Sequence, residues 1–389
     1  MKKFHLFDLP KEIRIELNKN YHNKIFSLAC KKVGSYYKLA KLIDVSSKEF
    51  YNWKNRKYPL PIFVLEKIAS LLQISQSEIE LKVKALKFYK GTIKNPKLPI
   101  RLDENLSLIL AGILGDGGIS KEYRVYYCNS KNILINSFIN SVRKSLGKVK
   151  ITQDITEKGI RTIFFSKLFG RILVELFSLP TGDKTYKDYS VPSLIFSSKN
   201  SIISTFLQRL FDDEGSVHRT ARNIRISTTI ESDKLLDDKG PKRLFEIKEL
   251  LNKFSIRSSE PNKTGEDFHK SFNGKLAKVE HWELGIYDRK SLENFAENIG
   301  FKLSYKRKSL ITAINSFKRY AAPKGKCLDV FLEESLKLLE ENKRPFTSKE
   351  LSKKMGKSLE WSNHNLKILK ERKLIKQIEN EWPPNYTIK

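Results

Sequence analysis

Cysteine is scarce in this sequence of 389 residues. Its three cysteines are Cys30, Cys128 and Cys327. They lie far apart, their number is odd, and none has the paired cysteine or histidine spacing of a zinc site. This pattern argues against a disulfide framework and a zinc site, and it favours a protein of a reducing compartment.

Long hydrophobic runs are lacking as well. The longest is close to LILAGIL, residues 108–114, whereas a membrane-spanning helix needs about 20 apolar residues. The stretch MKKFHLFDLP at the amino terminus turns polar too soon for a signal peptide. We therefore expect a cytoplasmic protein with no membrane partner.

Acidic residues are few relative to basic ones. The chain has 74 Lys and Arg residues against 44 Asp and Glu residues, which gives a formal net charge of +30. The sequence pI is about 9.8. Together with 11% aromatic residues, this excess indicates a polyanionic partner such as a nucleic acid. A basic but otherwise ordinary surface is the alternative.

Residues 1–95 predict a small, mainly helical domain. Leu39, Ala40 and Ile43 mark one face of a short helix, the turn DVSS follows, and a second helix covers about 48–54. This pattern resembles the lambda-repressor-like helix-turn-helix class, which implies DNA contacts from the second helix. An ordinary three-helix bundle is the alternative. The candidate contacts are Tyr51, Asn52 and Lys54.

Glycine and proline at 91–99 predict a linker to a middle domain at 100–320, and a second break is expected at 321–325. Residues 323–389 then read as helix, turn and helix with an extended tail from Lys373. This segment resembles a winged helix, with Asn363 and His364 as candidate nucleic-acid contacts. A helical protein-interaction module is the alternative.

The middle domain contains an internal duplication, with repeats at 104–199 and 200–320. SLILAGILGDGGIS (107–120) and STFLQRLFDDEGSV (204–217) each drive an apolar helix into an acid that is followed by glycine. The acids are Asp116 and Glu214. Each is followed by strand, amphipathic helix, strand and helix in the same order, and chance alone would rarely produce that agreement. A glycine-capped amphipathic helix is the alternative for one copy alone.

Each repeat closes with a similar basic segment. Lys184 and Lys187 in the first copy align with Lys302 and Lys306 in the second, where one extra residue separates the pair. The alignment makes Lys184 and Lys302 the first candidates for stabilising charge at a reacting phosphate. Lys187 and Lys306 are expected to contact nucleic acid, as are Arg124 and Arg225.

This duplication resembles the LAGLIDADG (DOD-type) endonucleases in their single-chain, two-repeat form. The resemblance implies an α+β fold of two αββαββα repeats on a pseudo-twofold axis, with saddle-shaped antiparallel sheets on duplex DNA. It also implies that the two helices pack together through small residues such as Ala111 and Gly115, and that Asp116 and Glu214 are the catalytic, metal-binding acids.

The chemistry of two converging carboxylates agrees with that role. They repel each other unless cations lie between them, and oxygen donors with few other ligands suit Mg²⁺ or another divalent cation such as Mn²⁺. Metal ions that bridge the attacking and leaving oxygens promote phosphodiester hydrolysis.

Two residues of the second copy depart from the family pattern. Arg209 stands where the family has glycine, and Asp213 stands where it has a small residue. Bulk there opposes close helix packing, although the two side chains, four residues apart, could pair with each other.

Three functions follow from these observations. The first is a free-standing, monomeric homing-type endonuclease that cuts double-stranded DNA. The second is a ribonuclease of the same fold that processes structured precursor RNA. The third is a DNA-binding regulator with weakened catalysis, which the departures at the helix contact favour.

Overall fold

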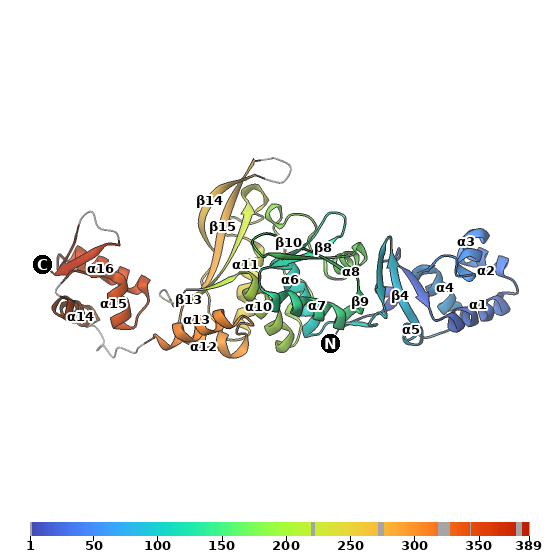
Figure 1. Ribbon diagram of the computed structural model, residues 1–389, viewed down its shortest axis with the longest axis horizontal. Coiled ribbons are helices and arrows are strands. Elements are labelled where there is room, and N and C mark those ends of the chain that lie inside the picture. Colours follow the sequence, from blue (N-terminus) through green and yellow to red (C-terminus); the bar gives the residue numbers. More distant parts are fainter. Residues whose placement is uncertain are drawn as a thin grey trace. The chain divides into compact units, whose positions relative to one another are not determined.

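The computed structural model describes residues 2–218, 222–270, 276–317, 327–342, 344–378 and 383–388 (Figure 1). The chain forms two compact units: Met1–Glu214 with Thr228–Leu250 and Lys263–Trp282, and Gly215–Ser227 with Leu251–Asn262 and Glu283–Lys389. None of the described helices is long and apolar enough to cross a membrane. The domain borders expected from the sequence stay predictions, and the expected break at 321–325 lies outside the described residues.

The amino-terminal part combines helices with short strands. Ser46 caps α3 by accepting a hydrogen bond from the backbone of Glu49, and Asp44 takes the left-handed conformation that ends α2. The expected helix–turn–helix arrangement is therefore present. The elements in chain order are β1 (Lys3–Phe4), η1 (Leu6–Asp8), β2 (Arg14–Leu17), α1 (Lys19–Val33), α2 (Tyr36–Ile43), α3 (Ser47–Lys54), β3 (Leu60–Pro61), α4 (Ile62–Leu72), α5 (Gln76–Glu80), β4 (Val83–Phe88), β5 (Gly91–Lys94) and β6 (Ile100–Arg101).

The segment 91–99, expected to be a linker, contains strand β5. On one side β5 pairs with β4. On the other side it pairs with β9 (Lys148–Val149), where Ile93 lies opposite Val149. The predicted linker therefore contains a paired strand, one of whose partners lies more than fifty residues away along the chain.

The first repeat places its helices on one face of an antiparallel sheet with the order β10-β11-β8-β7 (Figure 1). Tyr127 on the covered face stacks on Phe138 of α7, with ring centroids 4.6 Å apart. The elements are α6 (Glu104–Leu114), β7 (Gly117–Ile119), β8 (Val125–Asn129), α7 (Asn132–Leu146), β10 (Ile151–Ile155), β11 (Arg161–Phe165) and α8 (Lys167–Phe177).

The second repeat has the same element order, and its sheet order β12-β13-β15-β14 corresponds strand by strand to that of the first repeat. The α+β duplicated core that the sequence predicts is thereby confirmed. The elements are α10 (Asn200–Glu214), β12 (Gly215–His218), β13 (Asn223–Glu231), η3 (Ser232–Lys234), α11 (Lys242–Asn252), β14 (Asn262–Lys270), β15 (Leu276–Ile286), α12 (Arg289–Asn298) and α13 (Ser304–Asn315).

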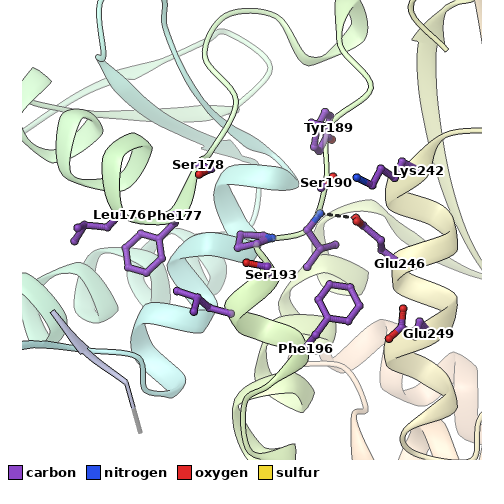
Figure 2. A pocket seen from close by; sticks show the side chains of 13 residues that line it. Leu176, Phe177, Ser178, Tyr189, Ser190, Ser193, Phe196, Lys242, Glu246 and Glu249 are labelled. Atoms are coloured by element: carbon purple, nitrogen blue, oxygen red, sulfur yellow. Dashed lines mark hydrogen bonds between the residues drawn. The ribbon is translucent and has the colours of Figure 1, made fainter. Parts of the chain in front are cut away.

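The connection between the repeats is fastened to α11. It contains the 3₁₀ helix η2 (Lys184–Tyr186) and α9 (Ser193–Phe196). The backbone N–H of Val191 donates to the Glu246 carboxylate at 2.7 Å, and Figure 2 shows this bond. Both residues line a cavity of about 670 Å³. Asp188 accepts hydrogen bonds from the backbone of Leu236 and Lys242 at the start of α11. These bonds fix the course of the connection.

The carboxyl-terminal part has its own hydrophobic core, with Phe331, Leu351 and Leu366 fully buried. Its three strands form a sheet of order β16-β18-β17. The helical pair and the strands that follow it lie where the sequence predicts helix, turn, helix and extended tail. The elements are α14 (Cys327–Asn342), β16 (Phe346–Thr347), α15 (Ser348–Met355), α16 (Leu359–Glu371), β17 (Ile375–Gln377) and β18 (Asn385–Ile388).

Candidate active site

The two acids singled out from the sequence lie at equivalent ends of two packed helices. Helices α6 and α10 pack against each other. Asp116 lies two residues beyond the end of α6, after the C-cap Gly115, and Glu214 is the last residue of α10. Electrostatic repulsion between the two carboxylates contributes to the raised pKa of Asp116, so the two helix ends bring the acids within interaction range.

A glycine at the end of α6 makes the close contact with α10 possible. A Cβ atom on Gly115, the C-cap of α6, would lie 2.8 Å from the Cβ of Asp213, whereas one on Gly112 would first meet the Phe138 ring of α7 at 2.8 Å. Above these glycines the Ser107 hydroxyl donates to the backbone carbonyl of Ile202 at 2.7 Å. We call this α6–α10 contact the seam.

The two departures from the family pattern pair with each other inside the seam. Nε of Arg209 lies 3.2 Å from Oδ2 of Asp213, and both side chains are buried. The guanidinium also lies over the Tyr127 ring, 4.5 Å from its centroid, and the Tyr127 hydroxyl donates to Oδ1 of Asp213 at 2.9 Å. Burial raises the pKa of the Asp213 carboxyl to about 7, and Arg209 opposes that shift. The seam therefore accommodates the two large side chains as an ion pair in which the opposite charges of Arg209 and Asp213 offset each other.

The carboxyl of Asp116 is poorly solvated. Burial first, and the charge of Glu214 second, raise the pKa of this carboxyl to about 6, against the opposing influence of Arg209 and Lys184. The Asn129 amide donates to Oδ2 of Asp116 at 2.6 Å. Sequence reasoning missed Asn129. It lies on β8 two residues beyond Tyr127, and the alternation of a strand therefore places both on the same face.

Two lysines hold the helix ends. Nζ of Lys184 donates to the carbonyls of Ile113, Leu114 and Gly115 at the end of α6. Burial lowers the pKa of Lys184 to about 8. In the second repeat Lys306 is buried, and its Nζ donates to the carbonyl of Gly215 at 2.6 Å.

The structure therefore pairs Lys184 with Lys306 at the helix ends, whereas the sequence alignment paired Lys184 with Lys302. Lys302 is exposed, and Lys187 donates to the carbonyl of Thr181 at 2.6 Å. The contacts of Lys184 and Lys306 position the ends of the helices that carry the acids.

The predicted nucleic-acid contacts are distributed over three parts of the chain. On α3, Tyr51 is exposed and Lys54 lies over the Tyr36 ring at 4.5 Å. Arg124 is exposed and lies 4.2 Å over the Phe164 ring, and Arg225 is paired with Glu283 at 3.3 Å. Their roles stay predictions. The remaining candidates are half-buried Asn52 on α3, and Asn363 and His364 on the exposed side of α16.

The donor set at the helix ends fits a divalent cation. Two carboxylates from different helices converge, and burial together with Glu214 disfavours the negative charge on Asp116. A bound Mg²⁺ or Mn²⁺ would compensate that charge with hard oxygen ligands. Among the described residues no cluster of three or more His, Cys, Asp or Glu side chains could hold a metal ion. Asp116 and Glu214 would hold the cation as a pair of carboxylates, and Mg²⁺ usually keeps several waters as its remaining ligands.

Comparison with known proteins identifies the second repeat directly. Residues 201–300 match the family model of the LAGLIDADG-like domain. Glutamine–fructose-6-phosphate aminotransferase of Methanocaldococcus jannaschii is 25% identical over 268 residues, which are 65% of this chain and 21% of that protein. The probable translation initiation factor IF-2 of Thermococcus kodakarensis is 28% identical over 149 residues, 38% of this chain and 11% of that protein. The chain thus spans about a fifth or less of these relatives.

Solved structures of low sequence identity also match. The homing endonuclease I-DmoI in complex with DNA and manganese matches with a TM-score of 0.32 and 17% identity, over 51% of this chain and 98% of that chain. Full-length WhiA from Thermotoga maritima matches with a TM-score of 0.34 and 14% identity, over 70% and 92% of the two chains.

Proposed function

Since this chain is a two-repeat protein of the LAGLIDADG family, we propose that it is a metal-dependent endonuclease that hydrolyses phosphodiester bonds in double-stranded DNA. The observation that carries the proposal is the pair Asp116 and Glu214 at the ends of α6 and α10. The two carboxylates repel each other when no cation is present. A cation bound between them would remove this repulsion.

The residues around the acids have distinct tasks in this proposal. Asp116 and Glu214 would hold a divalent cation, which would stabilise the charge that develops on the phosphate. The Asn129 amide fixes the orientation of the Asp116 carboxylate through its bond to Oδ2. Lys184 holds the last carbonyls of α6, so the position of Asp116 relative to α10 is set before substrate binds.

The curated relatives favour a homing-type role. Their names describe an aminotransferase and a translation initiation factor, two different activities, yet each matches this chain over only 21% or 11% of its own length. A segment that recurs within proteins of different function is typical of a mobile element that carries its own activity. The net charge of +30 agrees with a nucleic-acid partner.

The flanking parts extend the contacted site in this proposal. The α2–α3 pair has the helix–turn–helix arrangement that places a second helix in the major groove, and Tyr51 and Lys54 lie on that helix. The carboxyl-terminal part would act as a winged helix with α16 as its recognition helix. Longer contact supports recognition of one locus in a genome.

The test is a nicking assay on supercoiled plasmid DNA and on structured RNA, side by side, with Mg²⁺, with Mn²⁺ and with a chelator. We expect metal-dependent cleavage of the DNA. Asp116→Asn and Glu214→Gln should abolish cleavage, whereas binding should stay within about threefold of wild type because affinity comes from many phosphate contacts. Glu297→Gln, at an exposed position on α12, is the matched control and should cut normally.

Other outcomes discriminate between the rival functions. Cleavage of RNA alone would establish a ribonuclease of this fold. Tight DNA binding by the wild type without cleavage under any metal condition would favour the regulator. The structural feature in favour of a regulator is the buried Arg209–Asp213 pair at the seam. Either single mutant cutting at the wild-type rate would overturn the assignment of the acids.

A further inference from the structure

A basic groove lies between the turn of the β4–β5 hairpin and the open face of the first-repeat sheet. Its volume is about 630 Å³. On the sheet side it is lined by Arg124, Lys150 and Phe164, and on the hairpin side by Tyr89 and Lys90. We call it the hairpin groove. The β4–β5 hairpin that forms one side of this groove belongs neither to the α2–α3 helix–turn–helix nor to the two repeats.

Strand register shows that the groove opens on the face of the sheet opposite the helices. Phe164 lies opposite Tyr126 in the β11–β8 pair and opposite Thr152 in the β10–β11 pair. The neighbours Ile163 and Phe165 are buried, so successive side chains alternate between the two faces. The hairpin groove therefore lies on the outer face, the one that the resemblance to the LAGLIDADG endonucleases places on duplex DNA.

The charge lining the groove has one sign. Lys90, Arg124, Lys150 and Lys167 contribute four exposed cationic side chains, and no carboxylate is among the described residues that line it. Four cations around one concave surface repel one another and attract a polyanion. Arg124 is held over the Phe164 ring at 4.2 Å, so its guanidinium is fixed where a phosphate could approach.

Tyr89 lies at the rim of the hairpin groove, with a backbone conformation and an exposure that are unusual for a tyrosine. Phe88 lies opposite Gly91 in the hairpin register, so Tyr89 and Lys90 form a two-residue loop. Tyr89 has a φ of 49°, a conformation that glycine or asparagine adopts more readily in such loops. Its side chain is 86% exposed. The Tyr89 ring meets the Phe88 ring edge-on with centroids 4.7 Å apart, but this contact leaves most of the side chain exposed, where it could stack on a nucleic-acid base.

We propose that the hairpin groove binds one strand of the nucleic acid beyond the cleavage centre, with the cations on phosphates and the Tyr89 ring stacked on an unpaired base. The inference rests on the proposed function, because it requires nucleic acid on the outer face of the first-repeat sheet. It makes the hairpin an additional specificity element, one that discriminates a locally opened flank from a fully paired one.

The experiment compares binding of two labelled probes by the full-length chain in the presence of a chelator. One probe is a blunt 30-base-pair duplex, and the other carries a five-nucleotide single-stranded tail at each end. Wild type is expected to bind the tailed probe more tightly. Tyr89→Gly should remove most of this advantage, about fivefold or more, while Tyr89→Phe should keep it. Since glycine suits a positive φ, Tyr89→Gly should not lower the melting temperature.

Charge variants test the phosphate contacts. Lys90→Glu and Lys150→Glu should weaken binding of both probes. Each should also make the negative slope of log affinity against log salt concentration shallower by about 1. The matched control is Lys144→Glu, an exposed position on α7 on the helical side of the sheet, which should change the slope less.

The outcomes separate this inference from the proposed function. If wild type binds neither probe, both fail. If wild type binds the probes but the Tyr89 and Lys90 variants bind them equally well, the hairpin groove is not a nucleic-acid site, while the endonuclease proposal stands. If the lysine variants bind weakly but wild type shows no preference for the tailed probe, base stacking by Tyr89 is overturned.

Discussion

Gly115 and Asp213 touch across the seam so closely that a Cβ on the glycine would lie 2.8 Å from the Cβ of the aspartate. The contact explains why α6 carries glycine at this position while α10 does not need it. One helix supplies the space and the other fills it. The seam is therefore asymmetric, although the repeats on either side of it share their element order.

Gly115→Ala should destabilise the protein by about 1–3 kcal/mol, because the added methyl group meets a buried side chain that its ion pair holds in place. Gly265→Ala is the matched control, since its nearest neighbour would lie 3.9 Å away. Urea denaturation of both variants measures the difference. Equal stability of Gly115→Ala and wild type would show that the helices separate without cost.

The Arg209–Asp213 pair predicts a non-additive result. Arg209→Met should cost about 3–5 kcal/mol, because it leaves a buried carboxylate without its cation. Asp213→Leu should lower the free energy of unfolding by a similar amount, since it leaves the buried Arg209 guanidinium without its carboxylate partner. The double variant should be more stable than either single variant. The measurement is a double-mutant cycle by urea denaturation, and strictly additive losses would contradict the coupling.

Sequence patterns predicted the parts of the site that are local or repeated. Apolar spacing and a following glycine placed Asp116 and Glu214 at helix ends, and the repeated order of elements supported the duplicated fold. The pairing of Arg209 with Asp213 followed from their spacing of four residues on one helix.

The parts that were missed depend on distant partners. Asn129 joins the site only because β8 folds back beside β7, thirteen residues after Asp116. Lys306 rather than Lys302 reaches the end of α10 because Lys306 lies within α13, which begins at Ser304, whereas Lys184 lies in the short helix η2. The structural counterpart of Lys184 therefore lies four residues from the aligned Lys302, which is more than the one-residue insertion accounts for.

Truncation should affect the two ends of the chain unequally. Removing residues 2–95 deletes β5, the partner of β9, and Phe4, whose ring contacts Phe177 at 5.0 Å. We expect a large loss of stability in the first repeat, measurable by thermal denaturation. Removing the chain from residue 323 onward deletes a part with its own buried core and should lower stability less, while weakening nucleic-acid binding. Equal melting temperatures for both truncations would contradict this division.

His22 predicts a specific loss of stability in acid. The ring is buried in α1 and stacks on Phe26 with centroids 4.7 Å apart. Its Nε2 lies 3.1 Å from the carbonyl oxygen of Trp53 and 3.2 Å from that of Lys54. Burial lowers the pKa of His22 below its usual value of 6.5, although the bond to Lys54 opposes that shift.

As the pH falls through 6.5, the unfolded chain therefore gains a proton at His22 before the folded chain does. The stability that the neutral ring contributes is present above pH 6.5 and is lost below it, at most about 1.4 kcal/mol per pH unit for one proton. His22→Gln should be less stable than wild type at pH 7.5 but should lose less on going to pH 5.5. Urea denaturation at both pH values measures this, with His364→Gln on the exposed side of α16 as the control. An unchanged pH dependence in His22→Gln would mean that other groups govern acid stability.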